Sequence, residues 1–354
     1  MPHMTAFARN QWYVAAYDHE VGREGLLGRT VLGEPLVLYR TGREGTPVAL
    51  HDRCVHRRYP LSASRLDGDR LVCGYHGFTY DPTGTCVYVP GQKRVPRTAR
   101  VAAYPVVERD SLVWVWIGDP ARADPETIPR ARHLDSPGWV TVRGMEPIDA
   151  DYGLLVDNLL DLSHETYLHG GHIGTPEVAE TPITTEVDEG AGIVRVSRHM
   201  DDAACPPFYA RSTGIEGRIT RRQDIEYHAP CLYLLHSRIA PVGARPAADG
   251  GPDGFRTEIT YAITPSAAGK VYDFWLVSRD WATDDAEVTE FLRDSNHTVV
   301  RQDVDALNLL QRALGGERTG YQELSINIDT GGLAARRILA RLVEEGDKPV
   351  ERVR

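Results

Sequence analysis

The sequence predicts an α+β protein of two domains, an all-β domain over residues 1–125 and an α+β domain over residues 126–354 with an antiparallel sheet and helices. At 354 residues, the chain is long enough for each half to bury a core of its own. Up to residue 118, short β-branched and aromatic segments alternate with Gly, Pro and Asp, which is typical of an all-β module. Helical periodicity dominates only residues 285–315 and 331–345.

Strands in the first domain are expected where such a segment is bounded by turn residues. The expected strands are 12–16, 30–32, 36–39, 47–50, 71–73 and 112–117. The run Gly118-Asp119-Pro120 ends the last strand, because glycine and proline interrupt a strand. A polar, proline-bearing connection follows, so the domain boundary is expected within residues 120–135.

Strands and helices are mixed in the second domain. The segments expected to form strands are 193–196, 232–235, 257–263 and 272–277, because they are rich in β-branched and aromatic residues. Residues 244–254 are rich in Gly, Pro and Ala, and we expect a loop there.

The composition is that of a globular protein, with 42% hydrophobic and 25% charged residues. No apolar run approaches the 18 residues of a membrane helix, and residues 1–10 lack the apolar core of a signal peptide. Five cysteines without a paired framework fit a reducing compartment. We therefore expect a cytoplasmic protein without a membrane partner.

Two cysteine–histidine pairs, Cys54-x-His56 and Cys73-x-x-His76, are the most informative motif. One Cys and one His on each of two loops suit a Rieske-type 2Fe–2S cluster, in which two thiolates bind one iron and two imidazoles bind the other. A structural zinc site also accepts two Cys and two His, but zinc sites usually pair Cys with Cys and His with His. The spacing favours the cluster, and zinc is the alternative.

The net charge of −10 disfavours nucleic acid as a partner, because binding to phosphates needs clustered Lys and Arg. The group Arg53, Arg57 and Arg58 is local. We expect it to complement the charge of the cluster loop, or to dock an acidic electron donor.

A second metal site is indicated by His164 and His169, which lie just before Gly170-Gly171. On an ideal helix these side chains would point about 140° apart, since each residue turns the helix by about 100°. The helix must therefore tighten or unwind by His169 if both imidazoles are to share a metal, and the glycines make that feasible. Two histidines and one carboxylate are the ligands of non-haem Fe(II) oxygenases.

Over nearly its whole length the chain resembles the Rieske-type non-haem iron oxygenases. The resemblance rests on residues 53–62 and 73–78, where Gly74 and Phe78 replace the usual Pro and Trp, and on residues 157–171. In that last run four residues are on pattern: Asn158, Asp161, His164 and His169.

Residues 10–15 and 328–337 are most similar to the shorter members that demethylate aromatic acids, such as vanillate O-demethylase oxygenase and dicamba demethylase. This likeness implies a catalytic domain of the helix-grip type. It also implies a monooxygenase of enzyme class 1.14, active in the catabolism of lignin-derived aromatic compounds.

The resemblance implies that the mononuclear Fe(II) is bound by His164, His169 and a carboxylate from a helix near the C-terminus. Asp303 and Asp305 compete for that place. Asp303 lies beside the apolar stripe of this helix, whereas Asp305 points away from it. Asp303 also matches the family position, and we choose it.

The same resemblance puts Asn158 and Asp161 in the catalytic site. It implies a homotrimer in which Asp161 contacts His76 of a neighbouring subunit and passes electrons from that cluster to the iron. Asp161 lies three residues before His164, so we expect the two side chains to share a helix face.

No Gly-x-Gly-x-x-Gly motif opens a helix after a strand, so the chain has no predicted nicotinamide site. A separate flavin and iron–sulfur reductase is expected to supply electrons from NADH or NADPH. On the family likeness, O₂ serves to hydroxylate a methoxy methyl group, and formaldehyde is released. Vanillate would give protocatechuate, and syringate is a second candidate substrate.

Two other functions stay open. One is ring hydroxylation or N-demethylation of another aromatic substrate by the same irons. The other is an electron carrier without enzymatic activity. Residues near the predicted strands 232–235 and 272–277 are candidates for binding a flat aromatic acid: Tyr233, Ser237, Arg238, Tyr272 and His297.

Overall fold

A computed structural model of the chain describes residues 6–42, 45–244, 254–315 and 323–346. The chain divides into two compact units. The first unit is Arg9–Ile128 together with Thr264–Ala268, and the second takes in Pro129–Ile263 and the described residues from Gly269 onward. Of the expected loop 244–254, residues 245–253 lie outside the described residues.

The first unit is all-β. Its described residues form a three-stranded sheet and two four-stranded sheets in which neighbouring strands are antiparallel. The strands are β1 (Gln11–Tyr17), β11 (Leu112–Ile117) and β10 (Val106–Arg109) in the first sheet; β2 (Leu27–Val31), β3 (Glu34–Thr41), β4 (Thr46–His51) and β9 (Ala103–Tyr104) in the second; and β5 (Arg65–Asp67), β6 (Arg70–Val72), β7 (Thr79–Tyr80) and β8 (Cys86–Tyr88) in the third. Short 3-10 helices lie at Asp18–Glu20, Leu61–Ala63, Pro120–Arg122 and Pro125–Thr127.

Thr264–Ala268 belongs to the first unit because its backbone bonds to strands of that unit. Leu32 donates its N–H to the carbonyl of Pro265 at 2.8 Å. The hydroxyl of Thr264 donates to the carbonyl of Val14 at 2.7 Å. The sequence did not indicate that this short segment, so far along the chain, would join the all-β unit.

The second unit is built on an antiparallel sheet, which has seven strands within the described residues. Its strands, in spatial order, are β12 (Val140–Ile148), β18 (Lys270–Arg279), β17 (Phe255–Ala267), β16 (Leu232–Pro241), β15 (Arg218–His228), β14 (Ile193–Ala204) and β13 (Thr184–Asp188). The helices are α1 (Tyr152–Leu160), α2 (His164–Leu168), α3 (Pro176–Glu180), α4 (Pro207–Thr213), α5 (Ala286–Gly315) and α6 (Thr330–Gly346), with 3-10 turns at Arg132–Asp135 and Asn327–Asp329. The α+β prediction for this half is confirmed.

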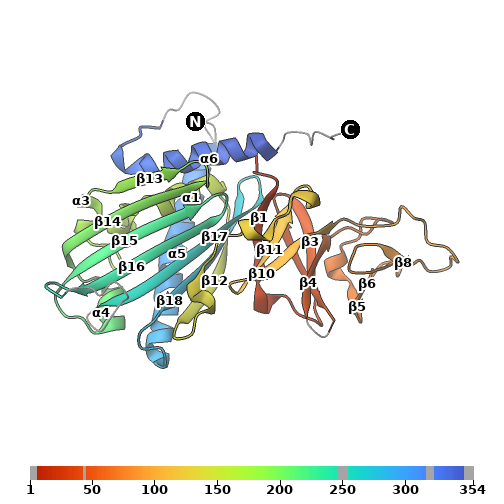
Figure 1. Ribbon diagram of the computed structural model, residues 1–354, viewed down its shortest axis with the longest axis horizontal. Coiled ribbons are helices and arrows are strands. Elements are labelled where there is room, and N and C mark those ends of the chain that lie inside the picture. The colour runs from red at the N-terminus through yellow and green to blue at the C-terminus, as the bar shows by residue number, and fades with distance from the viewer. Residues whose placement is uncertain (1–5, 43–44, 245–253, 316–322, 347–354) are drawn as a thin grey trace. The chain divides into compact units, whose positions relative to one another are not determined.

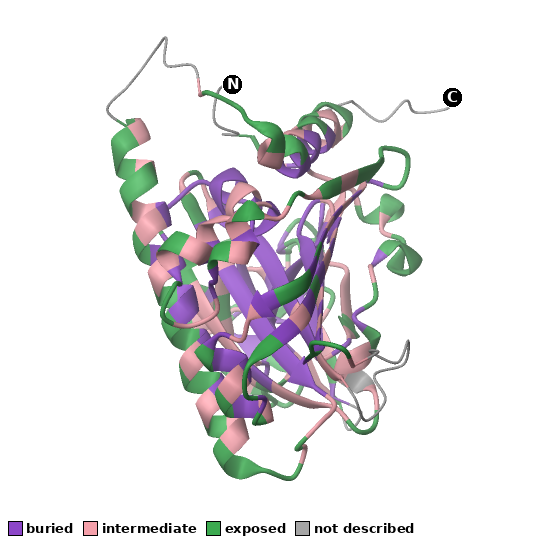
Figure 2. Cartoon of the chain, turned by 90° about the vertical axis from the view of Figure 1, so that its left-hand side faces the viewer, coloured by how far each residue is buried: buried purple, intermediate pink, exposed green. Residues whose placement is uncertain are grey.

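The long helix α5 covers one face of this sheet (Figure 1). Val300 and Val304 of α5 share one apolar core with Tyr233 of β16 and Trp275 of β18. Because side chains alternate along a strand, odd-numbered residues of β16 and β18 point toward α5 and even-numbered ones point to the opposite face. The sheet interior is buried, while α5 exposes its outer side (Figure 2). The face toward α5 is called the inner face below.

Strands β12 and β15 were not among those expected from the sequence. β15 reads Arg-Ile-Thr-Arg-Arg-Gln-Asp-Ile-Glu-Tyr-His, which is too polar to be recognised as a central strand. It lies between β14 and β16, and their hydrogen bonds satisfy its backbone on both sides. Among the described residues, no helix is long and apolar enough to cross a membrane.

Candidate functional site

The two cysteine–histidine loops share one backbone design. In the first, the N–H of Cys54 donates to the carbonyl of Tyr59 at 2.9 Å, and the N–H of Arg58 donates to the carbonyl of Cys54 at 2.8 Å. In the second, Cys73 bonds to Phe78 at 2.8 Å and Gly77 to Cys73 at 3.0 Å in the same pattern. Each loop therefore turns back on itself in the same way and presents one cysteine from the same position.

Both turns need a left-handed residue at the fourth position after the cysteine. Gly77 adopts φ +73° there without steric cost, whereas Arg58 adopts φ +58°, a conformation that costs a residue with a side chain about 1 kcal/mol. The first loop is closed by Asp52, which accepts bonds from the N–H and hydroxyl of Ser62, both at 2.6 Å. These bonds keep Arg58 in its strained conformation.

The four predicted cluster ligands are divided between the inside and the surface. Cys54 and Cys73 are each 2% exposed, whereas His56 and His76 are exposed. The two imidazole rings lie with centroids 4.6 Å apart. Burial raises the pKa of the Cys73 thiol, and the neighbouring Cys54 raises it further. Two adjacent buried thiols with two imidazoles outside them fit a cluster whose thiolate-bound iron is interior and whose imidazole-bound iron faces solvent.

Tyr80 lies beneath this site and hydrogen-bonds to one cysteine. Its hydroxyl oxygen accepts the N–H of Val55 at 3.2 Å and lies 3.1 Å from Cys54 Sγ. Because the hydroxyl oxygen already accepts a hydrogen bond from the backbone N–H, its own hydrogen is free to form a hydrogen bond to a thiolate. Burial first, and then Cys54, raise the pKa of Tyr80 well above its usual range, so the phenol stays protonated and able to donate.

In the second unit, three predicted ligands meet although they come from distant parts of the chain. Asp303 Oδ1 lies 3.5 Å from His164 Nε2 and 3.2 Å from His169 Nε2, and the ligand atoms of all three lie within 4.8 Å of one another. Asp303 is buried on the sheet-facing side of α5, whereas Asp305 is exposed. Of the two competing carboxylates, only Asp303 therefore has the geometry of a ligand.

The chain unwinds where the two histidines require it. α2 begins at His164 and ends at Leu168. His169 follows with φ −114° and ψ 22°, outside the helical range, and its ring is inclined by 79° to that of His164. This break brings together two imidazoles that a continuous helix would have pointed apart.

Each imidazole is oriented through its other ring nitrogen. His164 Nδ1 lies 2.6 Å from the backbone carbonyl of Asp161, and His169 Nδ1 lies 2.7 Å from Gln302 Oε1. Both partners are acceptors, so both rings carry their proton on Nδ1 and direct the Nε2 lone pair at the shared point. Asn158 donates from Nδ2 to Asp303 Oδ1 at 3.1 Å and so orients the carboxylate.

These residues fit a metal ion. His169 is 1% exposed, and its buried Nε2 makes no hydrogen bond although Asp303 is near. A buried polar atom without a partner is costly, and a cation at the shared point would satisfy it. Burial lowers the pKa of His169, but Asp303 and Gln302 outweigh burial and leave it raised. Two imidazoles and one carboxylate with open positions suit Fe(II).

The expected common helix face of Asp161 and His164 is wrong. α1 ends at Leu160, and Asp161 is an extended residue with φ −120° and ψ 93°. Its backbone carbonyl, not its carboxylate, meets His164, while the carboxylate accepts the N–H of Ser163 at 2.9 Å. The chain leaves α1 here, and α2 begins at His164 in a different direction.

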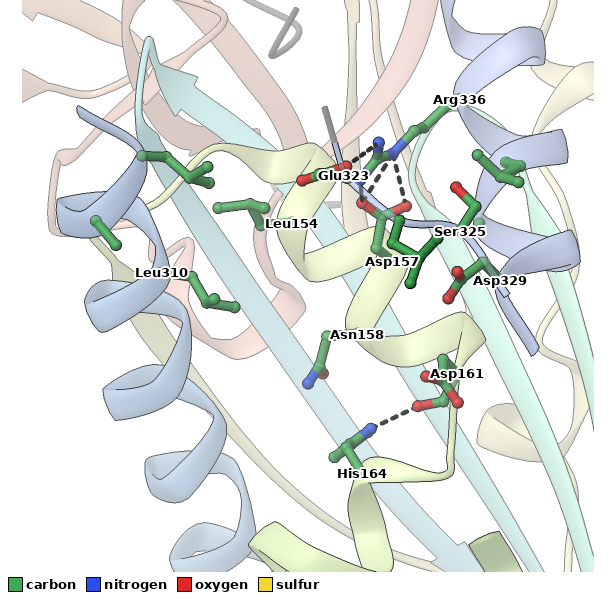
Figure 3. Close-up of a pocket in the computed structure, with 15 residues that line it drawn as sticks. Leu154, Asp157, Asn158, Asp161, His164, Leu310, Glu323, Ser325, Asp329 and Arg336 are labelled. Carbon is green, nitrogen blue, oxygen red and sulfur yellow. Dashed lines mark hydrogen bonds and ion pairs between the residues drawn. The ribbon is translucent and has the colours of Figure 1, made fainter. Parts of the chain in front are cut away.

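An open pocket of about 680 Å³ leads to this centre from one side. Asn158, Asp161 and His164 lie on one wall, and Leu310 of α5 lies opposite (Figure 3). Arg336 of α6 pairs with Asp157 and Glu323 at the far end. The side chain of Asp161 is thus accessible from outside the unit.

The predicted substrate contacts divide between the two faces of the sheet. Tyr233 and Ser237 are on the inner face, where the Ser237 hydroxyl bonds to Tyr209 Oη at 2.7 Å. Arg238 and Tyr272 are even-numbered and point to the opposite face, so their prediction is wrong. His297 on α5 is half exposed and pairs with Glu146 at 3.2 Å. The sequence did not reveal the faces, because residues 232–235 are all buried.

Several functional candidates on the inner face were not recognised from the sequence. Glu165 of α2 accepts bonds from Arg221 at 2.9 Å and Gln223 at 3.0 Å, which anchor the ligand-bearing helix to the sheet. Arg198, 3% exposed, bonds to the carbonyl of Thr181 through Nε. Among the described residues, the buried polar atoms on this face without a hydrogen-bond partner include Arg198 Nη2, Gln223 Oε1 and Tyr233 Oη.

Two protein-family models match the chain. Residues 11–105 match the Rieske [2Fe-2S] domain. Residues 148–345 match the vanillate O-demethylase oxygenase C-terminal domain. The second match covers the whole candidate metal centre.

The chain is also similar to characterised proteins along most of its length. It is 35% identical to the vanillate O-demethylase oxygenase subunit of Pseudomonas sp. (strain HR199), over 95% of each chain. It is 37% identical to the iron–sulfur subunit of the toluene-4-sulfonate monooxygenase system of Comamonas testosteroni, over 80% of this chain and 82% of that one. The crystal structure of dicamba monooxygenase with non-haem iron and dicamba matches with a TM-score of 0.81 and 30% identity, over 96% of this chain and 98% of that one.

Substituting the buried carboxylate tests the metal centre. We expect Asp303→Ala to lower the iron content from about three to about two atoms per chain, with the visible spectrum of the cluster unchanged. Asp305→Ala, two residues along the same helix and exposed, is the matched control and should retain all the iron. Metal analysis and absorbance of both purified variants provide the readout, and a third iron kept by Asp303→Ala would contradict the assignment.

Removing the Tyr80 hydroxyl tests the cluster environment. A donor to a thiolate stabilises the reduced, more negative cluster, so Tyr80→Phe should lower the reduction potential by about 60 mV for a hydrogen bond of about 1.4 kcal/mol. Tyr104→Phe removes a hydroxyl that faces Glu34 instead and serves as the control. Spectroelectrochemical titration measures both, and an unchanged potential in Tyr80→Phe would show that the hydrogen bond is not formed.

Proposed function

The chain belongs to the Rieske-type non-haem iron oxygenases that include vanillate O-demethylase oxygenase, and we propose that it O-demethylates a methoxylated aromatic acid such as vanillate or syringate. It is a monooxygenase, and its cofactors are a Rieske 2Fe–2S cluster and a mononuclear non-haem iron. We propose Cys54, His56, Cys73 and His76 as the ligands of the cluster, and His164, His169 and Asp303 as the ligands of the iron.

One observation carries the proposal above all others. Asp303 and two imidazoles converge on a buried point where His169 Nε2 has no hydrogen-bond partner. Three ligands from one side leave positions open for O₂ beside a substrate. An electron carrier without a substrate would have no use for such a centre.

The reaction needs one O₂, two electrons and two protons for each methoxy group. When bound, the iron supplies activation of O₂ for insertion of one oxygen atom into a methyl C–H bond. The resulting hemiacetal breaks its C–O bond to release formaldehyde and a phenol, and the second oxygen atom leaves as water. Vanillate would give protocatechuate in this way.

The protein residues serve to position the ligands and to exclude water. The carbonyl of Asp161 and the amide oxygen of Gln302 face Nδ1 of His164 and His169 as hydrogen-bond acceptors, which fixes the tautomer that presents Nε2 to a metal. Asn158 restrains the Asp303 carboxylate. Glu165 anchors α2 to the sheet through Arg221 and Gln223.

For substrate binding we propose the buried inner-face groups that lack partners. Tyr233 Oη can donate to a carboxylate or accept from a phenol, and Arg198 Nη2 can donate to a carboxylate. Ser237 is already bonded to Tyr209, so it would contact substrate only through that pair. Apolar residues of the core, among them Leu235 and Ile239, line much of the same face, as an aromatic ring requires.

We propose that electrons come from a separate reductase containing flavin and an iron–sulfur centre, which oxidises NADH or NADPH. They would then pass from the cluster of one subunit to the iron of its neighbour in a homotrimer, through His76 of the first and Asp161 of the second. His76 is exposed beside Tyr75, which is 60% exposed. The pocket at Asp161 is bordered by exposed Leu310 and Leu324, and such apolar rims favour association between subunits.

A second candidate reaction is hydroxylation of a methyl group on an aromatic sulfonate. It is favoured by the 37% identity to the toluene-4-sulfonate monooxygenase subunit. Like vanillate, toluene-4-sulfonate is an aromatic anion, so the same pocket chemistry serves both. Ring hydroxylation and N-demethylation remain less favoured alternatives.

A substrate screen tests the proposed function. With a surrogate reductase, NADH and vanillate, we expect about one formaldehyde released per NADH oxidised, with protocatechuate as the aromatic product. Toluene-4-sulfonate and syringate are assayed in parallel. NADH oxidation without formaldehyde from any methoxylated acid would contradict O-demethylation, and a hydroxymethyl product from the sulfonate would favour the second candidate.

Substitution of Asp161 tests the proposed route of the electron. Asp161→Ala should keep both metal centres but slow electron transfer to the iron by about tenfold or more. The expected defect is seen in single-turnover product formation from pre-reduced enzyme without reductase. Asp329→Ala, which removes another acid from the same pocket, is the control. Equal single-turnover rates in Asp161→Ala and wild type would rule out the route.

A further inference from the structure

The cluster-bearing segment has a charge opposite to that of the rest of the chain. Residues 53–100 contain nine Lys and Arg against three Asp, a net charge of +6. Because the whole chain carries −10, the remaining residues carry −16. The segment that bears the cluster residues and the rest of the chain therefore carry net charges of opposite sign.

Much of the positive charge is exposed close to the cluster ligands. Five exposed side chains on two neighbouring loops, called the basic rim below, are Arg57, Arg58, Lys93, Arg94 and Arg97. The second cluster loop connects them: a Cβ placed on Gly77 would lie 3.1 Å from Pro90, and the ring of Phe78 stacks on that of His56 in the first loop, with centroids 4.9 Å apart. Val89 and Val95 also pack into the core that holds Cys54 and Cys73.

The basic rim has no acidic partners within the described part of the chain. None of its five side chains forms an ion pair there, whereas several other arginines of the same unit do. The paired ones are Arg9 with Glu34, Arg29 with Glu20, Arg40 with Glu108, and Arg109 with Glu126. The described part of the chain therefore does not neutralise the five charges of the basic rim, and they are left for a partner from outside.

We propose that the basic rim is the docking surface for the electron donor, and that this donor is an iron–sulfur protein or domain with an acidic face. The proposal rests on the proposed function, in which a separate protein reduces the cluster. One electron leaves the reduced donor, which is oxidised, and enters the oxidised cluster, which is reduced. No bond is formed or broken, so the surface needs only to allow a brief approach to the cluster.

Electrostatics favours such a transient donor over a permanent subunit contact. A donor must bind and leave in every electron-transfer cycle, and complementary charge accelerates encounter without requiring a large buried area. Permanent interfaces are instead depleted of Lys and enriched in apolar residues at their cores.

Charge reversal in the full-length protein with both metal centres tests this proposal. The variant is Lys93→Glu/Arg94→Glu, and the probe is a reduced plant-type 2Fe–2S ferredoxin with an acidic surface. At low ionic strength the second-order rate constant for cluster reduction should fall on the order of tenfold or more. The difference should shrink as salt is raised, because exposed charges are screened. Calorimetric titration with oxidised ferredoxin should show a matching loss of affinity.

Two controls separate docking from general damage. Arg122→Glu reverses an exposed charge of the same unit outside the basic rim and should retain most of the wild-type rate. The methyl viologen radical cation, a reductant of opposite charge, should reduce the double variant at least as fast as wild type. No aromatic substrate is present in these assays, so the result does not depend on which acid is demethylated.

Three outcomes would overturn the proposal. The first is an unchanged ferredoxin rate in the double variant, or no reduction of the wild type by ferredoxin. The second is equal slowing with both reductants, which would indicate a damaged cluster. The third is a normal ferredoxin rate combined with loss of the oligomer by light scattering or slower single turnover of pre-reduced enzyme, which would assign the basic rim to a subunit contact.

Discussion

The buried carboxylate of Asp303 is the constraint on which the catalytic unit depends. It lies on α5 among Val300, Val304 and Leu307, where a charged group is unfavourable unless it is paired. Asn158 and two imidazoles provide the pairing from α1 and α2. Helices distant in sequence must therefore pack closely on one sheet, and a cation at their meeting point would neutralise the excess charge.

The residues around the metal centre orient the predicted ligands and do not add further ones. Gln302 precedes Asp303 in sequence and orients His169, so adjacent residues of α5 serve two different members of the centre. Glu165 follows His164 and anchors α2 to the inner face through Arg221 and Gln223. The same inner face retains unpartnered polar atoms of Arg198 and Tyr233, which a tightly optimised core would not contain. The proposed binding of a polar aromatic ligand would give them partners.

The all-β unit builds its site from two short loops rather than from helices and a sheet. Its two loops repeat one backbone pattern, with Arg58 and Gly77 in equivalent left-handed positions. The cysteines are buried and the histidines exposed, which fits the proposed entry of electrons on the imidazole side. The segment around these histidines carries a positive net charge, whereas the remaining chain carries a negative one.

The sequence by itself determined the chemistry, because ligand types and their spacing are local properties. It contained both cysteine–histidine pairs, the need for the chain to unwind at His169, and the fold class of each half. It did not contain the faces of β16, since residues 232–235 are all buried, or the end of α1 before Asp161. Only the tertiary structure decided that a backbone carbonyl and Gln302 orient the imidazoles, and that Arg198 Nη2 and Tyr233 Oη lie buried without a hydrogen-bond partner among the described residues. Those properties depend on contacts between segments far apart in sequence, which no local pattern records.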